Sequence, residues 1–193
     1  TVRDILKTYD PEVLRYLMLS SHYRSPINFS EDLMEQAKNS LERLYNALYS
    51  MDHLESVTLD KELSKDDNKY LAKIQFNMHE FIKAMDDDFN SADAIASLFN
   101  IVREYNMNID EKSPRELVKR TKEILLNLGS VLGFFRKFME KNLLDEEIEQ
   151  KIQERQEARK NKNYALADKI RDELKAQGII LEDTPAGVRW KRQ

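Results

Sequence analysis

The chain contains no cysteine and only four glycines and four prolines among its 193 residues. Without cysteine it forms neither a disulfide nor a thiolate metal site, which fits a reducing compartment. Glycine and proline are the residues that most often interrupt regular structure, so their scarcity favours long helices joined by few turns. No apolar run approaches the roughly 20 residues of a membrane-spanning helix. We therefore expect no membrane segment.

Signatures of catalysis and metal binding are also missing. His22, His53 and His79 have no partner at a ligand-like spacing, and there is no Gly-rich phosphate loop, HExxH or GxSxG motif. The run Asp86, Asp87, Asp88 lacks the alternating ligands, central glycine and late glutamate of an EF-hand loop, so a solvated helix end explains it better. We predict no catalytic, cofactor or metal-binding residue in this chain.

Charge, in contrast, is plentiful and unevenly distributed. Charged residues make up 34% of the chain and hydrophobic residues 41%, a mixture that still forms a core. Residues 148–193 carry a net charge of +3 and residues 1–147 a net charge of −7, which gives −4 overall. A basic end on an acidic chain favours nucleic acid as the partner of that end.

Apolar residues recur at helical spacing from residue 13 to residue 135. Asp10 followed by Pro11, Ser30 and Ser91 are typical helix N-caps, and Ser113–Pro114–Arg115–Glu116 reads as a capping box. The last apolar stripe of this region runs from Leu117 through Val131 to Phe135. Because an amphipathic helix needs another apolar face to cover it, we predict a mainly α protein in which residues 1–142 form an antiparallel helical bundle.

A second unit is predicted over residues 143–193. Ile148 and Ile152 give a thin apolar stripe, and Asn163 is placed to cap a helix from Tyr164 to about Gln177. Gly178 suits the end of that helix. The apolar runs 179–181 and 188–190, separated by a Thr-Pro-Ala-Gly turn, predict a small β-hairpin. The module therefore combines a helical hairpin with a β-hairpin.

The candidate site is the basic face of this module. Guanidinium groups suit phosphates and guanine, carboxylates accept from base amino groups, and exposed aromatics stack on unpaired bases. These chemistries point to RNA. The alternative is an ordinary solvated face with Trp190 in the core of the module. The candidates are Arg155, Arg159, Lys160, Lys162, Tyr164, Asp168, Asp183, Trp190, Lys191 and Arg192.

Three segments resemble one protein family. DPEVLRYLMLSSHYRSPINFSEDL and AMDDDFNSADAIASLF are similar to the helical region of bacterial cysteinyl-tRNA synthetases. ERQEARKNKNYALADKIRDELKAQGIILEDTPAGVRW is similar to their C-terminal end, nearly residue for residue. The resemblance implies a class I aminoacyl-tRNA synthetase whose helical bundle is a DALR-type anticodon-binding domain.

The resemblance also implies what each part does. The family uses ATP and zinc in a catalytic domain whose signatures are absent here, so the chain would start after the active site and could not aminoacylate by itself. Arg159, Tyr164, Asp168 and Asp183 would face the GCA anticodon, Arg159 at its guanine, with Trp190 either stacking or in the core. The other basic candidates would contact the tRNA backbone. The expected partners are tRNA(Cys) and the catalytic domain of the same chain, in a cytoplasmic monomer.

Two other functions stay open on the sequence. A ligase that joins cysteine to a small sugar-like acceptor shares the helical region but has no tRNA to read, so it should lack the C-terminal module. A non-enzymatic helical scaffold would use its apolar stripes for protein partners and leave the basic face idle.

Overall fold

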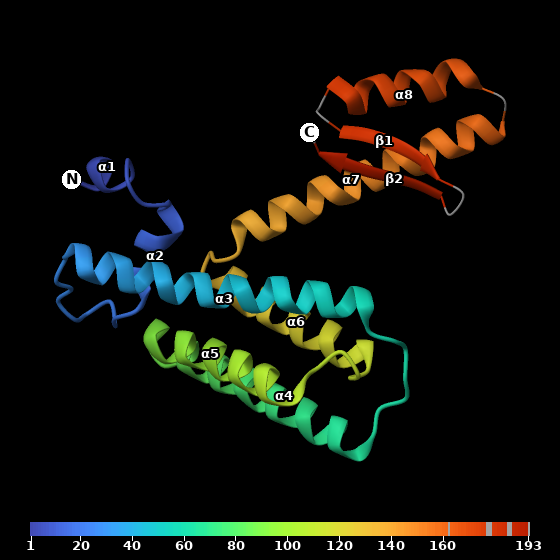
Figure 1. The fold of residues 1–193 in the computed structure, drawn as a ribbon. Helices are drawn as coiled ribbons and strands as arrows, with labels where there is room; N and C mark the ends of the chain where they lie inside the picture. Colours follow the sequence, from blue (N-terminus) through green and yellow to red (C-terminus); the bar gives the residue numbers. More distant parts are fainter. Residues whose placement is uncertain (162, 177–178, 185–186, 193) are drawn as a thin grey trace. The chain divides into compact units, whose positions relative to one another are not determined.

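The chain is mainly helical, as predicted, and its elements follow one another in a simple order (Figure 1). A computed structural model describes residues 1–161, 163–176, 179–184 and 187–192; in these ranges the side chains of 141–146, 149, 182–184 and 187–192 are not described. The helices are α1 (Val2–Ile5), α2 (Pro11–Leu19), α3 (Glu31–Val57), α4 (Lys65–Asp86), α5 (Ser91–Asn108), α6 (Arg115–Val131), α7 (Arg136–Lys160) and α8 (Tyr164–Ala176). The strands are β1 (Ile179–Thr184) and β2 (Gly187–Arg192).

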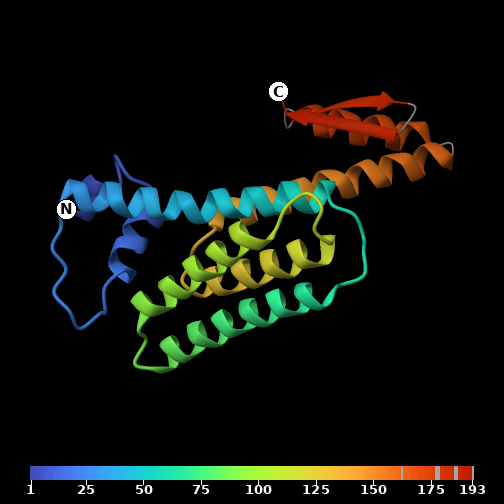
Figure 2. The same ribbon diagram turned by 60° about the horizontal axis from the view of Figure 1, so that its bottom comes forward.

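The chain divides into two compact units, Thr1–Arg136 and Lys137–Gln193. In the first unit α3, α4, α5 and α6 run alternately up and down beside one another (Figures 1 and 2). Large apolar side chains with almost no exposed surface fill the space between these helices, such as Leu44, Leu48, Ile74, Leu98 and Leu125. Burying each of these side chains contributes about 1.5–3 kcal/mol, so this shared core holds the unit together.

Two of the predicted helix starts are confirmed by their caps. The Asp10 carboxylate accepts a hydrogen bond from the Glu12 amide at 2.8 Å, and the Ser30 hydroxyl accepts one from the Leu33 amide at 3.2 Å. These side chains satisfy amide groups that lack a partner within the helix. The cap of α5 is Asn90 instead of Ser91, because the Asn90 side chain accepts from the Asp93 amide at 3.2 Å.

The capping box predicted at Ser113 is wrong. Pro114 is the N-cap residue of α6 and makes no side-chain cap. The Ser113 hydroxyl turns back instead, accepting from the Asp110 amide at 3.0 Å and donating to the Asp110 carboxylate at 3.1 Å. The Arg115 amide donates to the Leu59 carbonyl at 3.0 Å. The Ser113 hydroxyl therefore bonds within the turn before α6 and does not cap the helix, because short polar side chains readily bond to nearby backbone groups.

The stripe predicted to run through Val131 to Phe135 stops earlier. Helix α6 ends at Val131, whose side chain is 64% exposed, and Gly133 and Phe135 adopt positive φ angles of 72° and 70°. The resulting turn still buries Phe134 and Phe135 completely. It is fastened to α2, since the Glu12 carboxylate accepts from the Phe135 amide at 2.7 Å and Arg15 donates to the Gly133 carbonyl at 2.8 Å.

In the second unit α7, α8 and β1 enclose a small apolar cluster of Ile148, Ile152, Ile170, Leu174 and Ile179. The strands pair antiparallel from Ile179↔Arg192 to Thr184↔Gly187. Helix α7 is unbroken across residues 142 and 143, where the sequence placed the boundary between its two units. Gly178, expected to end α8, lies outside the described residues. Over the part of the chain that the structure describes, no helix is both long enough and apolar enough to span a bilayer.

Candidate nucleic-acid interface

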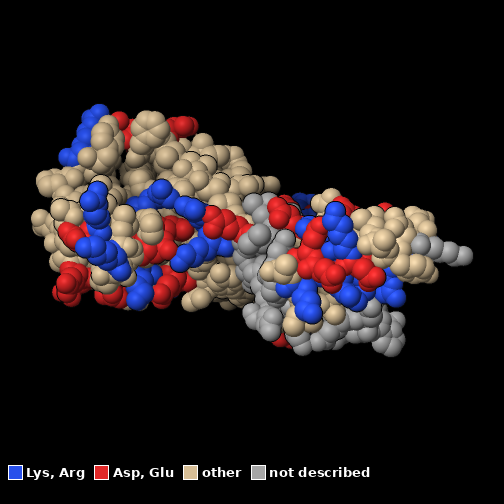
Figure 3. Space-filling view, turned by 90° about the horizontal axis from the view of Figure 1, so that it is seen from above, with Lys and Arg blue, Asp and Glu red and all other residues tan. Residues whose placement is uncertain are grey.

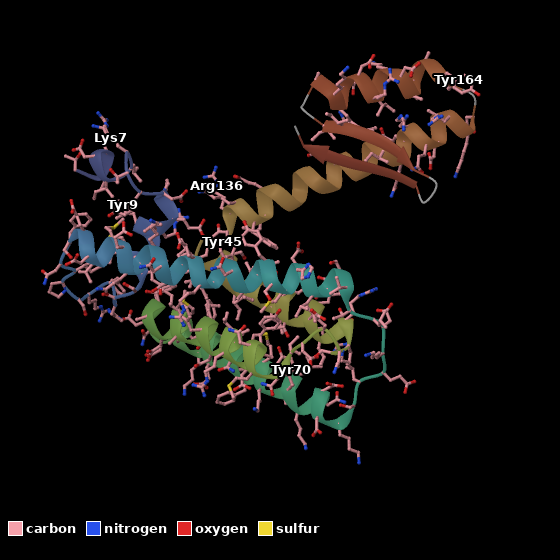
Figure 4. The ribbon with its side chains drawn as sticks, viewed as in Figure 1. Lys7, Tyr9, Tyr45, Tyr70, Arg136 and Tyr164 are labelled. Carbon is pink, nitrogen blue, oxygen red and sulfur yellow. The ribbon has the colours of Figure 1, made fainter. Side chains whose placement is uncertain are left out.

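Arg159 and Tyr164 flank the turn that joins α7 to α8. Arg159 is exposed in the last turn of α7, and Tyr164, the first residue of α8, is 60% exposed at that end of the unit (Figure 4). The turn is closed by the Asn163 amide, which donates to the Ala158 carbonyl at 2.8 Å. As predicted, the Asn163 side chain caps α8, accepting from the Leu166 amide at 3.3 Å. A guanidinium group and an aromatic ring are thus presented from one short, well-bonded corner.

Asp168 lies one helical turn after Tyr164, so the two share a side of α8. The Asp168 side chain is 67% exposed, and one of its oxygens lies 3.8 Å from the Arg171 guanidinium. A carboxylate on this side can accept from a base amino group, while a ring four residues away offers a stacking surface. Both side chains are accessible to a ligand.

Arg155 does not belong to this surface, contrary to the prediction of a phosphate contact. It is only 7% exposed and has interaction partners in the structure. The reason is helical geometry, because Arg155 follows the buried residues Ile148 and Ile152 at intervals of seven and three, on the face that α7 turns to its core. Arg155 and Arg159 lie four residues apart on α7, as the sequence indicates. Arg155 is nevertheless buried in the core of the unit, whereas Arg159 is exposed to solvent.

The other predicted contacts are only partly described. Lys160 is exposed at the end of α7. Lys162 lies outside the described residues, as do the side chains of Asp183, Trp190, Lys191 and Arg192. Their backbone places Asp183 opposite Val188 and Trp190 opposite Leu181 in the β1–β2 ladder. Asp183 therefore lies on β1, and Trp190, Lys191 and Arg192 lie on the paired strand β2.

The two flanks of the helical hairpin differ in charge. One flank forms a groove of about 420 Å³ lined by Glu154, Glu157, Glu173, Lys169 and the asparagines of the turn. Lys151 pairs with the Glu173 carboxylate at 3.3 Å, but the three carboxylates still exceed the two ammonium groups, which makes the groove unfavourable for a phosphate chain. The opposite flank of α8 carries Tyr164, Asp168, Arg171 and Lys175. In Figure 3 the acidic side chains of the unit form a central patch with Lys and Arg at its borders.

Arg171 and Lys175 were missed in the sequence. Both are exposed, and they continue the interval of three and four residues that begins at Tyr164 and Asp168. The interval itself was visible in the sequence, but which side of α8 faces solvent was not. Among the described residues no group of three or more His, Asp or Glu side chains is placed to hold a metal ion.

Comparison with known families accounts for most of the chain. Residues 1–39 match the catalytic domain of class I (C) tRNA synthetases, residues 80–136 match the DALR domain, and residues 141–190 match the cysteinyl-tRNA ligase anticodon-binding domain. The DALR domain in the first unit and the anticodon-binding domain in the second unit thus define the anticodon-binding portion of a class I aminoacyl-tRNA synthetase, preceded by a short stretch that matches the catalytic domain. The chain belongs to the cysteinyl-tRNA synthetase family, of which it carries the C-terminal region with a short tail of the catalytic domain.

This finding confirms the family recognised in the sequence. It also refines the description of residues 1–39, which the sequence assigned to the helical bundle and which match the end of the catalytic domain. Helices α1 and α2 and the first turns of α3 lie in that stretch. Glu12 and Arg15, which fasten the turn before α7, therefore come from the segment that matches the catalytic domain.

Proposed function

We propose that the second unit reads the anticodon of tRNA(Cys) through Arg159, Tyr164 and Asp168, in a cytoplasmic protein. An anticodon-binding domain implies tRNA binding, and the residue assignment goes beyond that. The observation that supports it is the exposure of a guanidinium, an aromatic ring and a carboxylate around one corner, while the apolar residues of the same two helices are buried.

The three side chains supply complementary contacts. Arg159 donates two parallel hydrogen bonds, which fit the two acceptors of a guanine edge. Asp168 accepts from the amino group of a cytosine or adenine base, and Tyr164 stacks on a base, a contact worth about 1–3 kcal/mol. Unpaired loop bases expose these edges, whereas the bases of an RNA helix do not. The anticodon loop is therefore the part of the tRNA that this surface fits.

The remaining predicted residues take supporting positions in this proposal. Lys160 and Lys162 follow Arg159 and would contact the backbone of the loop. Asp183, Trp190, Lys191 and Arg192 would contribute from the β-hairpin, which together with the helical hairpin makes one recognition module. Arg155 would support the module from inside, where its burial places it.

The test is binding of the chain to two labelled transcripts, tRNA(Cys) with its GCA anticodon and the same tRNA with the first anticodon base changed to adenine. We expect the unaltered chain to prefer GCA by about tenfold to a hundredfold, since a wrong base costs about 1–3 kcal/mol. Arg159→Ala should weaken binding of tRNA(Cys) and remove most of that preference, because the altered base is the one it contacts.

Arg120→Ala is the matched control, an arginine of α6 whose side chain is 50% exposed and paired with Glu116. It should leave the preference unchanged. Equal binding of both transcripts by the unaltered chain would refute the proposal, and the absence of salt-sensitive binding would favour a protein scaffold instead. The small-acceptor ligase is disfavoured by the match of residues 141–190 to an anticodon-binding domain.

A further inference from the structure

The outer flank of α8 carries one continuous polar stripe. Tyr164, Asp168, Arg171 and Lys175 follow at intervals of four, three and four residues, which places them on one side of a helix. All four are exposed. The stripe spans 11 residue steps, or about 16 Å along the helix axis. Its first half is aromatic and acidic and its second half is basic.

The two ends of the stripe suit different parts of an RNA strand. A ring and a carboxylate contact bases, whereas the guanidinium of Arg171 and the ammonium of Lys175 suit phosphates. The side of α8 that carries Lys169 and Glu173 lines the groove rich in carboxylates. Together with the neighbouring Asp172, the stripe carries two cations and two carboxylates, whereas the groove carries an excess of carboxylates, so the stripe repels a polyanion less than the groove does.

Among the described residues, Arg171 has two charged neighbours but makes no contact of hydrogen-bond length. Its guanidinium nitrogens lie 3.8 Å from an Asp168 oxygen and 3.6 Å from an Asp172 oxygen. Both separations exceed hydrogen-bond length, so these contacts act through charge. The Arg171 side chain is 53% exposed. A phosphate oxygen can therefore accept its N–H groups while the two carboxylates keep it on the stripe.

We propose that Arg171 and Lys175 bind the phosphate backbone of the RNA strand whose bases Tyr164 and Asp168 contact. This inference rests on the proposed function and adds the direction of the strand, along α8 away from the α7–α8 turn. Arg171 has a second role as a positioning residue for Asp168. The bound strand thus covers the length of α8 as well as the corner at Arg159.

The experiment measures the affinity of the chain for tRNA(Cys) between 50 and 300 mM KCl. Loss of one phosphate contact to a single strand lowers the slope of log affinity against log salt by about 0.7. Arg171→Gln and Lys175→Gln should each show that drop, with affinity about fourfold weaker at 150 mM and about eightfold weaker at 50 mM. The double variant should lower the slope by about 1.4. Lys169→Gln is the matched control on the groove flank.

Arg171→Lys separates the two roles of Arg171. It keeps the charge, so the salt slope should return toward that of the unaltered chain, while the preference for the GCA anticodon falls because a lysine holds Asp168 less firmly. The inference is overturned if Arg171→Gln and Lys175→Gln leave the slope unchanged or resemble Lys169→Gln. If the unaltered chain shows no anticodon preference, the proposed function itself fails. A merely structural effect would lower the melting temperature and leave the slope intact.

Discussion

Removing the Glu12 carboxylate should destabilise the first unit strongly. Glu12 is 6% exposed, and its two oxygens accept from the Phe135 amide at 2.7 Å and from the Tyr45 hydroxyl at 3.0 Å. In Glu12→Ala the buried Phe135 amide loses its acceptor, which costs about 1–3 kcal/mol. The half-buried Tyr45 hydroxyl loses a charge-assisted bond worth about 1–2 kcal/mol. We expect the free energy of unfolding to fall by about 2–5 kcal/mol, a large part of a typical total of about 5–15 kcal/mol.

Two further variants divide that loss. Glu12→Gln keeps a carbonyl oxygen for the Phe135 amide and can still bond to Tyr45, so it should cost about 1 kcal/mol. Tyr45→Phe removes only the second bond and should also cost about 1 kcal/mol. The Tyr45 ring packs edge-on against Phe135 with centroids 5.6 Å apart, and phenylalanine preserves this contact. Tyr45 comes from α3, in the first unit (Figure 4).

Urea denaturation can follow each unit separately. Trp190 is the single tryptophan of the chain and belongs to the second unit, so fluorescence excited at 295 nm reports on that unit. Far-ultraviolet circular dichroism is dominated by the long helices of the first unit. Glu12→Ala should move the dichroism midpoint and leave the fluorescence midpoint in place. A dichroism midpoint unchanged within error would refute the account, because a buried carboxylate with two donors cannot be neutral to remove.

Two further predictions concern buried groups of the helical bundle. Lys122, whose side chain is 17% exposed, contacts Glu55 and lies 3.0 Å from Asp52; burial opposes its charge, but the two carboxylates outweigh burial and raise its pKa. Lys122→Met should cost about 1–2 kcal/mol in urea denaturation, because two carboxylates then face each other without a cation. Lys69→Met, which breaks a fully exposed pair, should cost nothing measurable. Tyr70 donates or accepts a hydrogen bond with Thr121 at 2.8 Å, and burial raises its pKa above the ordinary value of 10.0. The unfolded chain therefore loses this proton first, so stability is complete below pH 10 and falls as the pH rises further. Tyr70→Phe should make that fall shallower when urea midpoints at pH 8 and pH 11 are compared, and an equal fall in both proteins would contradict the assignment.

Much of the local structure could be predicted because its causes are local. The caps at Asp10, Ser30 and Asn163 depend on one side chain and an amide two or three residues away. Such contacts form in any helix that starts there. The wrong predictions at Ser113 and Ser91 also have a local cause, since neighbouring polar residues compete for the same amide groups.

The candidate site was harder to predict because exposure is not local. Arg155 and Arg159 look alike in the sequence, four residues apart on one basic helix. The positions of Ile148 and Ile152 on α7, and the elements that pack on them, decide that Arg155 is inside while Arg159 is outside. Arg171 and Lys175 were overlooked for the converse reason, since nothing in their sequence distinguishes a flank that faces solvent from one that lines an acidic groove.

The amino-acid sequence alone determined that this chain is helical, that it carries a basic C-terminal module and that it belongs with the cysteinyl-tRNA synthetases. Periodicity, capping residues and the order of motifs are properties of residues near one another in the sequence, so they can be recognised without the tertiary structure. Tertiary structure decided which charges reach solvent and which carboxylate fastens the turn at Phe135, 123 positions from Glu12. Those outcomes depend on segments far apart in the chain packing together, and no local pattern encodes that choice.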